Sequence, residues 1–447
     1  MSRPEPVRPI YGFFSAPDPV VLLRGEAEVR MGDDSFSGEA DLLLRFVSAP
    51  RVLFHANTSI TVERKFHFFC DDSIEVSFLF KDQKIDGFRG RWRAGADGLE
   101  IDWYPESEPV VLCDMRQQTS VAAIFHLFNF PDFGGGQHQQ AAPQGCALLV
   151  LESEDWKISL QGLPENATGQ AWERIKNEGG CFLTHVVKME RKDGESFSGE
   201  DAQEQCSLLA SFLSFVKGSR CWPVCGVGLD AAGVTSWRTF ASPHAVRPPC
   251  SWFTPCKASQ AELLFPLFAK RWQQSEEWRN CLRSAIYWYL QANTRGGSPS
   301  IDAAIILAQS ALERLAYHSL VVDRKMISGK GFDDLRASDR LRMLFSVCGI
   351  PNEITDAAPD IRQANGSFKK ESKWMDAPHA ITDIRNSLVH PVSKKEMHDC
   401  YEDAWKLSLW YLELSVLALC GYDNTYTNRL TARYETDSES VPWGKKS

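Results

Sequence analysis

The chain has 447 residues, of which 43% are hydrophobic and 24% are charged. This composition is typical of an ordinary globular protein with two or three domains, and no apolar run is long enough to span a bilayer. The N-terminus lacks the apolar core of a secretory signal, so we expect a cytoplasmic protein without a membrane partner.

The charge is unevenly distributed along the chain. The net charge of −9 argues against a protein that coats nucleic acid non-specifically. Residues 1–269 hold 25 Lys and Arg against 35 Asp and Glu, whereas residues 270–447 hold 24 against 23. The C-terminal part is therefore near neutral and could carry a local basic surface.

The 13 cysteines are scattered and mostly in apolar surroundings, which predicts buried free thiols rather than disulfides or a zinc site.

Residues 1–195 are predicted to form a β-rich sensor or regulatory domain. Short segments rich in β-branched and aromatic residues alternate with turns such as Asp97-Gly98, a pattern typical of an antiparallel sandwich or barrel. The predicted strands are Val20–Leu23, Ala40–Val47, Ile74–Phe80, Leu99–Tyr104, Val121–Phe128, Cys146–Leu151, Trp156–Leu160 and Phe182–Val187.

Residues 196–257 are predicted to form a small α/β extension and linker. Ser198 to Asp201 has the pattern of a capping box, and Gly218 is suited to end the helix that follows. Short strands are expected at Val224–Leu229 and Val234–Phe240, before a turn-rich break that places the main domain boundary near residue 257.

Residues 258–434 are predicted to form a helical domain, which makes the fold class α+β multidomain. The polar, Lys-rich stretch Asp356–Lys373 predicts a loop, and residues 435–447 predict a disordered tail. Ser393 to Glu396 reads as a capping box for the last helix. The predicted helices are Glu262–Gln273, Glu276–Ala292, Ile301–Ser319, one between Ser338 and Gly349, Pro378–Val389 and Lys394–Leu419.

Arg385, Asn386 and His390 lie at the predicted end of the Pro378–Val389 helix. Pro391 pushes His390 out of the α conformation, so its side chain could swing beside Arg385. A His near a helix C-terminus is suited to proton transfer, and an Arg can clamp a phosphate and stabilise a five-coordinate phosphorus. RNA carries its own nucleophile, the 2′-OH, so this pair could cut RNA without a metal. Such cleavage would leave a 2′,3′-cyclic phosphate and a 5′-OH.

Cleavage of this kind works best with both a base and an acid, and one chain offers one such His. Two copies about a two-fold axis would offer two, which favours a homodimer. An Arg and a His five residues apart are common by chance, and a His at a helix end is more often a cap than a catalyst. Pro391, which is predicted to end the helix at this point, and the position of the motif between predicted helices favour a catalytic role.

The pattern Arg385-Asn386-x-x-x-His390 between two long helices resembles the R-x4–6-H signature of the HEPN superfamily, in which Asn, Asp or His commonly follows the Arg. Ala308–Leu315 resembles the second HEPN helix, and Leu419–Leu430 resembles the tail of ApeA-like HEPN proteins, a group implicated in bacterial anti-phage defence.

The resemblance implies a helical bundle, dimerisation and metal-independent endoribonuclease activity without a cofactor. Arg385 and His390 would be catalytic, and Asn386 would support them. Glu313 would face the cleft, although an ordinary ion-paired surface carboxylate is the alternative. Four further residues could contact RNA or could simply be solvated: Lys394, Lys395, Lys369 and Lys370.

The sequence thus predicts an endoribonuclease of a bacterial anti-phage, abortive-infection system, with RNA as substrate and a phage-derived trigger acting on the N-terminal domain. Two alternatives stay open. One is a non-catalytic HEPN nucleotide-binding or scaffold protein. The other is a HEPN toxin neutralised by a partner antitoxin, through modification of a Tyr near the motif such as Tyr401.

Overall fold

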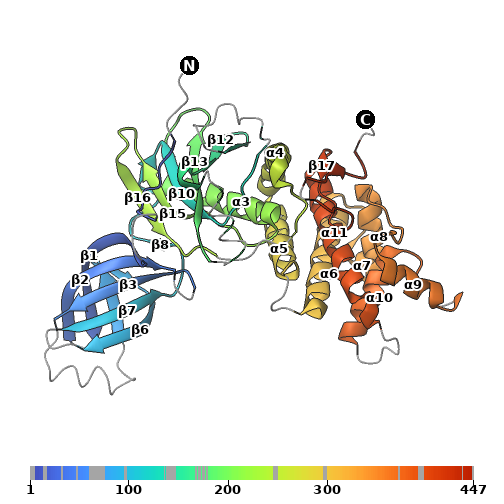
Figure 1. Cartoon of the computed structure of the whole chain (residues 1–447), viewed down its shortest axis with the longest axis horizontal. Helices are drawn as coiled ribbons and strands as arrows, with labels where there is room; N and C mark the ends of the chain where they lie inside the picture. Colours follow the sequence, from blue (N-terminus) through green and yellow to red (C-terminus); the bar gives the residue numbers. More distant parts are fainter. Residues whose placement is uncertain are drawn as a thin grey trace.

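The computed structural model runs from β-sheets at one end to a bundle of helices at the other (Figure 1). The fold is mixed α and β, as the sequence predicted. The residues that the structure describes are 6–13, 18–31, 34–46, 49–59, 76–94, 98–134, 136, 147–166, 169, 173, 177, 180–244, 250–294, 300–370, 373–390, 397–434 and 436–444.

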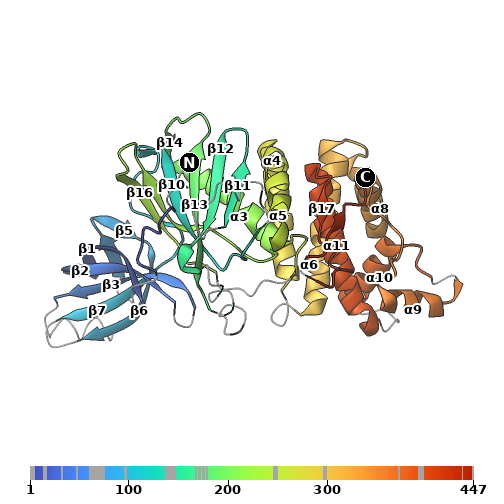
Figure 2. The same cartoon turned by 45° about the horizontal axis from the view of Figure 1, so that its top comes forward.

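The first sheet is antiparallel and curls into a half-barrel (Figures 1 and 2). Its strand order is β5-β4-β1-β2-β3-β7-β6. Four of these strands contain or overlap predicted ones, whereas β3, β5 and β6 had no predicted counterpart. The strands are β1 (Val20–Met31), β2 (Asp34–Arg45), β3 (Arg51–Thr58), β4 (Val76–Phe80), β5 (Gln83–Ile85), β6 (Gly87–Ala94) and β7 (Leu99–Pro105).

The second sheet has the order β11-β12-β13-β10-β15-β16-β8 and includes strands from both sides of residue 195. The predicted boundary at that position therefore falls between β13 and β15, which flank β10 in one sheet. The strands are β8 (Val110–Val111), β10 (Ala122–Phe128), β11 (Leu148–Glu152), β12 (Trp156–Gly162), β13 (Leu183–Arg191), β15 (Val224–Leu229) and β16 (Thr235–Phe240). A separate pair joins β9 (Thr119–Ser120) to β14 (Phe197–Ser198).

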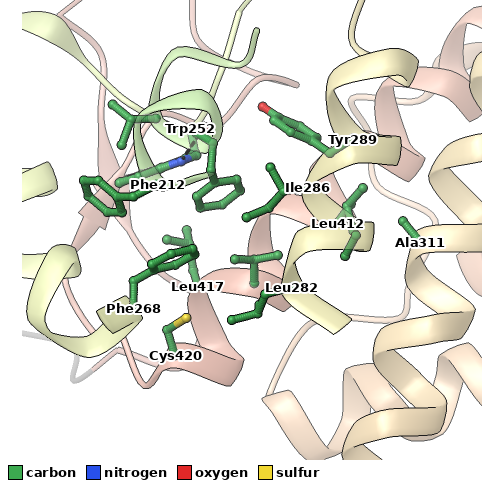
Figure 3. Close-up of a cluster of buried hydrophobic side chains, with 14 of the residues drawn as sticks. Phe212, Trp252, Phe268, Leu282, Ile286, Tyr289, Ala311, Leu412, Leu417 and Cys420 are labelled. Carbon is green, nitrogen blue, oxygen red and sulfur yellow. Dashed lines mark hydrogen bonds between the residues drawn. The ribbon is translucent and has the colours of Figure 1, made fainter. Parts of the chain in front are cut away.

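Helix α3 (Gly199–Lys217) connects the second sheet to the helices. It begins with the predicted capping box, in which Ser198 and Asp201 each accept a backbone N–H, and it ends at Gly218 in the left-handed conformation. The ring centroids of Phe212 on α3 and Phe268 are 5.5 Å apart. Figure 3 shows these rings among buried side chains of several helices. One hydrophobic core therefore runs from the second sheet into the helical region, across residue 257.

The helical region follows the predicted order, but it contains one short helix that was not predicted, Gly329–Asp333, and it needs three further corrections. Its helices are α4 (Ser259–Gln273), α5 (Glu276–Ala292), α6 (Ile301–Tyr317), α7 (Gly329–Asp333), α8 (Ala337–Cys348), α9 (Pro359–Ser367), α10 (Ala377–Val389) and α11 (Tyr401–Cys420). Short 3-10 or π turns occupy Pro164–Asn166, Pro255–Lys257, His318–Asp323 and His398–Cys400.

The first correction is that α9 lies inside the stretch predicted to be a loop. Only Ile361 is buried on this helix, so its polar sequence gave no apolar stripe. The second concerns α11, which begins at Tyr401 and not at Lys394, because residues 398–400 form a 3-10 turn. The predicted capping box at Ser393 to Glu396 lies outside the described residues.

The third correction is the tail, whose residues 436–444 are ordered rather than disordered. β18 (Glu439–Ser440) pairs with β17 (Thr425–Tyr426), Val441 is buried, and the Trp443 indole donates to the Tyr422 carbonyl at 2.8 Å. Val441, Trp443 and the pairing of β18 with β17 therefore hold in place a segment whose polar composition predicted disorder.

The N-terminal segment is held against the second sheet by His126 of β10. The backbone N–H of Ile10 donates to His126 Nε2 at 3.1 Å, so Nδ1 carries the proton and donates to the Cys225 carbonyl at 3.0 Å. Burial lowers the pKa of His126 to about 4, although its backbone hydrogen bonds act in the opposite direction. The neutral ring is therefore the form that fits the fold.

This arrangement predicts that stability falls on acidification. The folded pKa of His126 lies below the unfolded value of 6.5, so the unfolded chain binds more protons between pH 6.5 and 4. Chemical denaturation at pH 7 and pH 5 should show that the wild type loses about 2 kcal/mol more than His126→Gln, whose amide does not titrate. An identical pH dependence for the two proteins would contradict this role.

Candidate functional site

Helix α10 presents the Arg385 motif, and its two ends are set by local chemistry. The Asp376 side chain accepts the His379 N–H at the N-terminus, with Pro378 in the first turn. At the other end His390 leaves the helix in an extended conformation, with φ −115° and ψ 107°, while its N–H still donates to the Asn386 carbonyl at 2.9 Å. The helix therefore ends where Pro391 predicted.

Helix α10 is fixed against α6 and α8 in the orange and red part of Figure 1. Ala380, Ile381 and Ile384 are buried, and the buried Gln309 side chain of α6 donates to the Ile381 carbonyl at 2.5 Å. Arg342 of α8 binds the capping residue Asp376 at 2.5 Å and 3.0 Å. These contacts leave the Arg385 side of the helix partly exposed and hold its backbone in place.

Three charged side chains from three helices meet beside Asn386. Arg385 Nη1 donates to Asn386 Oδ1 at 3.2 Å, and Arg385 Nη2 lies 3.8 Å from Glu313 Oε1 on α6. Glu313 Oε2 accepts a hydrogen bond from Arg340 Nη1 on α8 at 3.2 Å. One carboxylate therefore faces two guanidinium groups, and its hydrogen bond goes to Arg340.

This arrangement leaves Arg385 with unused hydrogen-bonding capacity. The 3.8 Å separation from Glu313 exceeds hydrogen-bond length, so Arg385 Nη2 is only weakly paired. Arg385 Nε is buried without a hydrogen-bond partner in the part of the chain that is described, so an anion would be bound by the two Nη groups. Arg385 is only 24% exposed and Glu313 22%. A guanidinium that is partly shielded from water and weakly paired can bind an anion through more than one N–H.

Arg340 was not predicted as a site residue, although it donates the hydrogen bond that holds Glu313. Its other nitrogens donate to the carbonyls of Phe332 at 3.0 Å and Asp333 at 2.9 Å, and its guanidinium lies 4.8 Å from the centre of the Phe332 ring. Nothing local distinguishes it from a solvated helix arginine. Its role depends on the packing of α8 against α6.

The remaining predicted site residues are only partly placed. His390 is exposed, and no hydrogen bond joins its side chain to Arg385 within the described ranges, so their proximity stays a prediction. Lys369 and Lys370 are exposed just after α9. Lys394 and Lys395 lie outside the described residues.

The described residues contain neither a metal-binding cluster nor a membrane-spanning helix. Among residues 6–444 with the gaps given above, no three His, Cys, Asp or Glu side chains are grouped to hold a metal ion. Within the same residues, no helix combines the length and apolar character needed to cross a membrane.

Two segments of the chain resemble domains of YopA. Residues 115–251 match the YopA central domain and residues 275–440 match the YopA C-terminal domain. Over 438 residues the chain is 25% identical to the SPbeta prophage-derived uncharacterized protein YopA of Bacillus subtilis (strain 168), an alignment that covers 95% of each chain. No solved structure matches the chain. Arg385, Asn386, His390, Glu313 and Arg340 all lie inside the segment similar to the YopA C-terminal domain.

Proposed function

We propose that the chain is a metal-independent endoribonuclease of the HEPN type and that Arg385 and His390 carry out the cleavage. The observation that carries the proposal is the weakly paired Arg385 guanidinium beside Asn386, one turn before an exposed His at a helix end. Helix α10 supplies Arg385 and Asn386, and His390 is the residue that ends it. Glu313 and Arg340 fix the helix surface around them.

The proposed reaction uses the 2′-OH of the substrate as nucleophile. His390 removes the 2′-OH proton, the 2′-oxygen attacks the adjacent phosphorus, and the bond to the 5′-oxygen of the next nucleotide breaks. Arg385 donates to the non-bridging oxygens, whose negative charge grows in the five-coordinate transition state. The 5′-oxygen leaves with a proton, and the products are a 2′,3′-cyclic phosphate and a 5′-OH.

The departing oxygen needs a proton donor, and a second copy of the chain would supply it. A homodimer about a two-fold axis places two equivalent His390 side chains near one cleft, one as base and one as acid. The exposed position of His390 suits such a composite site.

The biological setting that we propose is bacterial anti-phage defence. A relative of prophage origin supports a role in conflicts that involve phages. The half-barrel lies at the far end of the molecule from α10 (Figure 2), where a phage-derived trigger could bind without blocking the RNA site.

Analysis of product ends tests this function. Purified protein incubated with single-stranded RNA and EDTA should yield fragments with 2′,3′-cyclic phosphate and 5′-OH ends, and the DNA of the same sequence should stay intact because it lacks the 2′-OH. Cleavage that needs a divalent cation, or fragments with 5′-phosphate ends, would refute the mechanism. Intact RNA, with or without phage protein present, would favour the scaffold interpretation.

A further inference from the structure

Strand β6 is a basic edge strand in a chain with a net charge of −9. Its sequence, Gly-Phe-Arg-Gly-Arg-Trp-Arg-Ala, contains three Arg and no acidic residue. It is the last strand of the half-barrel, paired with β7 on one side only in the part of the chain that is described. Charged residues commonly protect such edges from pairing with another chain, so the charge alone is no evidence of binding.

Exposed aromatic rings on the same strand do not fit a purely protective role. Phe88 is 55% exposed and stacks on Tyr104 of β7, with ring centroids 5.5 Å apart and planes at 29°. The Arg51 guanidinium of β3 lies 5.0 Å from the centre of the Tyr104 ring. Arginine, tyrosine and phenylalanine from three adjacent strands therefore form a continuous stack on the sheet surface, which we call the Arg51–Tyr104–Phe88 stack.

Gly90 gives the stack its shape. A Cβ at this position would lie 2.1 Å from Tyr104 Cε2, so the Tyr104 ring covers the backbone of β6 where the side chain is missing. The Tyr104 ring therefore packs closely against the β6 backbone and is only partly exposed. The stack is formed before any ligand arrives, which lowers the entropy lost on binding.

The cations around the stack are available for an anionic ligand. Arg51, Arg91 and Arg93 make no ion pair with a carboxylate within the described ranges. The nearby buried carboxylate, Asp102, is already engaged by His55 at 2.8 Å and lies 3.5 Å from Arg45. Glu100 of β7 lies opposite Arg93 in the sheet register, but no ion pair between the two is present in the described residues. The surface thus combines stacked rings with arginines that form no ion pair there.

We propose that the face formed by β6, β7 and the start of β3 binds single-stranded nucleic acid. An unpaired base stacks on Phe88, extending the Arg51–Tyr104–Phe88 stack, while Arg91 and Arg93, which both follow Phe88 along β6, bind the phosphates on that side of the base. A duplex keeps its bases stacked on one another and cannot use the rings. An acidic protein would use the arginines but would gain nothing specific from an exposed aromatic stack. The inference names a nucleic-acid contact beyond the cleavage site, and it is measured as binding rather than as cleavage.

Fluorescence anisotropy on the full-length chain tests the proposal. The probes are labelled oligodeoxythymidine, which lacks the 2′-OH and cannot be cut by the proposed mechanism, oligouridine with the His390→Ala variant, and a duplex of equal length. Phe88→Ala should weaken binding of both single strands about tenfold, the loss expected for one base stack. Trp222→Ala is the matched control, since Trp222 is 48% exposed and carries the Arg220 guanidinium 5.2 Å from its ring centre. It should change binding less than twofold.

A second variant tests the binding of the phosphates. Arg91→Gln with Arg93→Gln should lower the slope of log affinity against log salt by about 0.7 for each phosphate that is no longer neutralised. Arg116→Gln, which removes another exposed arginine, should leave the slope unchanged.

The proposal fails if Phe88→Ala behaves like Trp222→Ala, if the duplex binds as tightly as the single strands, or if the wild type binds neither oligodeoxythymidine nor oligouridine. Oligodeoxythymidine reports binding alone. The absence of binding at β6 would therefore not refute the proposed cleavage by Arg385 and His390, and the absence of cleavage would not refute binding at β6.

Discussion

We expect alanine at Arg385 or at His390 to lower the rate of RNA cleavage in EDTA by about 10²–10⁴-fold. A positioned general base contributes about 10²–10⁴-fold, and one charged donor to a developing oxyanion contributes about 10²–10³-fold. Both losses fall on the transition state, so single-turnover rates should drop while RNA affinity changes little. Because the two residues act on one phosphate, the double variant should be scarcely slower than either single variant.

Matched variants separate this chemistry from damage to the fold. His398→Ala removes another exposed His close to the motif, and Arg336→Ala removes an exposed Arg at the start of α8. Both should keep near wild-type activity. Asn386→Ala should cost less than Arg385→Ala, because Asn386 only accepts from the guanidinium in this structure. Equal rates for wild type, Arg385→Ala and His390→Ala would refute the catalytic assignment.

The helix ends could be predicted because their causes are local. Ser198 and Asp201 satisfy backbone groups within four residues of each other, and Gly218 supplies a left-handed end. Pro391 in the sequence is enough to end α10 at Val389. In each case the residues that decide the structure are neighbours in the chain.

Strand β6 could not be predicted, because its pairing depends on residues of another strand, β7, which lie beside it only in the folded protein. Its two glycines disfavour a strand locally, yet Tyr104 of β7 covers Gly90 and completes the surface. The same limit applies to the candidate site. The motif identifies Arg385 and Asn386, but Arg340 reaches Glu313 from a different helix, and no spacing in the sequence encodes that contact.

The burial of Glu413 also could not be predicted from the sequence. Its substitution should have the second large effect, a loss of stability. In the sequence it reads as an ordinary carboxylate on α11, yet it is fully buried in the structure. Arg429 donates to its two oxygens at 2.8 Å and 2.5 Å, and the Tyr289 hydroxyl donates to Oε1 at 2.5 Å. Arg429 also reaches Asn293 and the Cys250 carbonyl, so the pair joins α5 and α11 to the segments on either side of the helical region.

Burial alone would lower the pKa of Arg429, but the Glu413 carboxylate outweighs it and raises the pKa. Removing either partner therefore leaves a charge inside the protein with no counterion. We expect Glu413→Gln to lower the free energy of unfolding by about 3–5 kcal/mol, measured by chemical denaturation at pH 7. Glu402→Gln is the control on the same helix, since the Glu402 side chain is 63% exposed in its pair with Lys406, and it should cost about 0.5 kcal/mol or less.

The double variant Glu413→Gln with Arg429→Met distinguishes a charge effect from lost packing. It removes both charges, so it should be more stable than Glu413→Gln alone, even though it carries one more substitution. If the double variant is instead as unstable as the sum of the two single variants, the pair acts through shape and hydrogen bonds rather than through charge neutralisation. Arg429 lies in the segment that follows α11, so this outcome would also decide whether that segment stabilises the helices through charge.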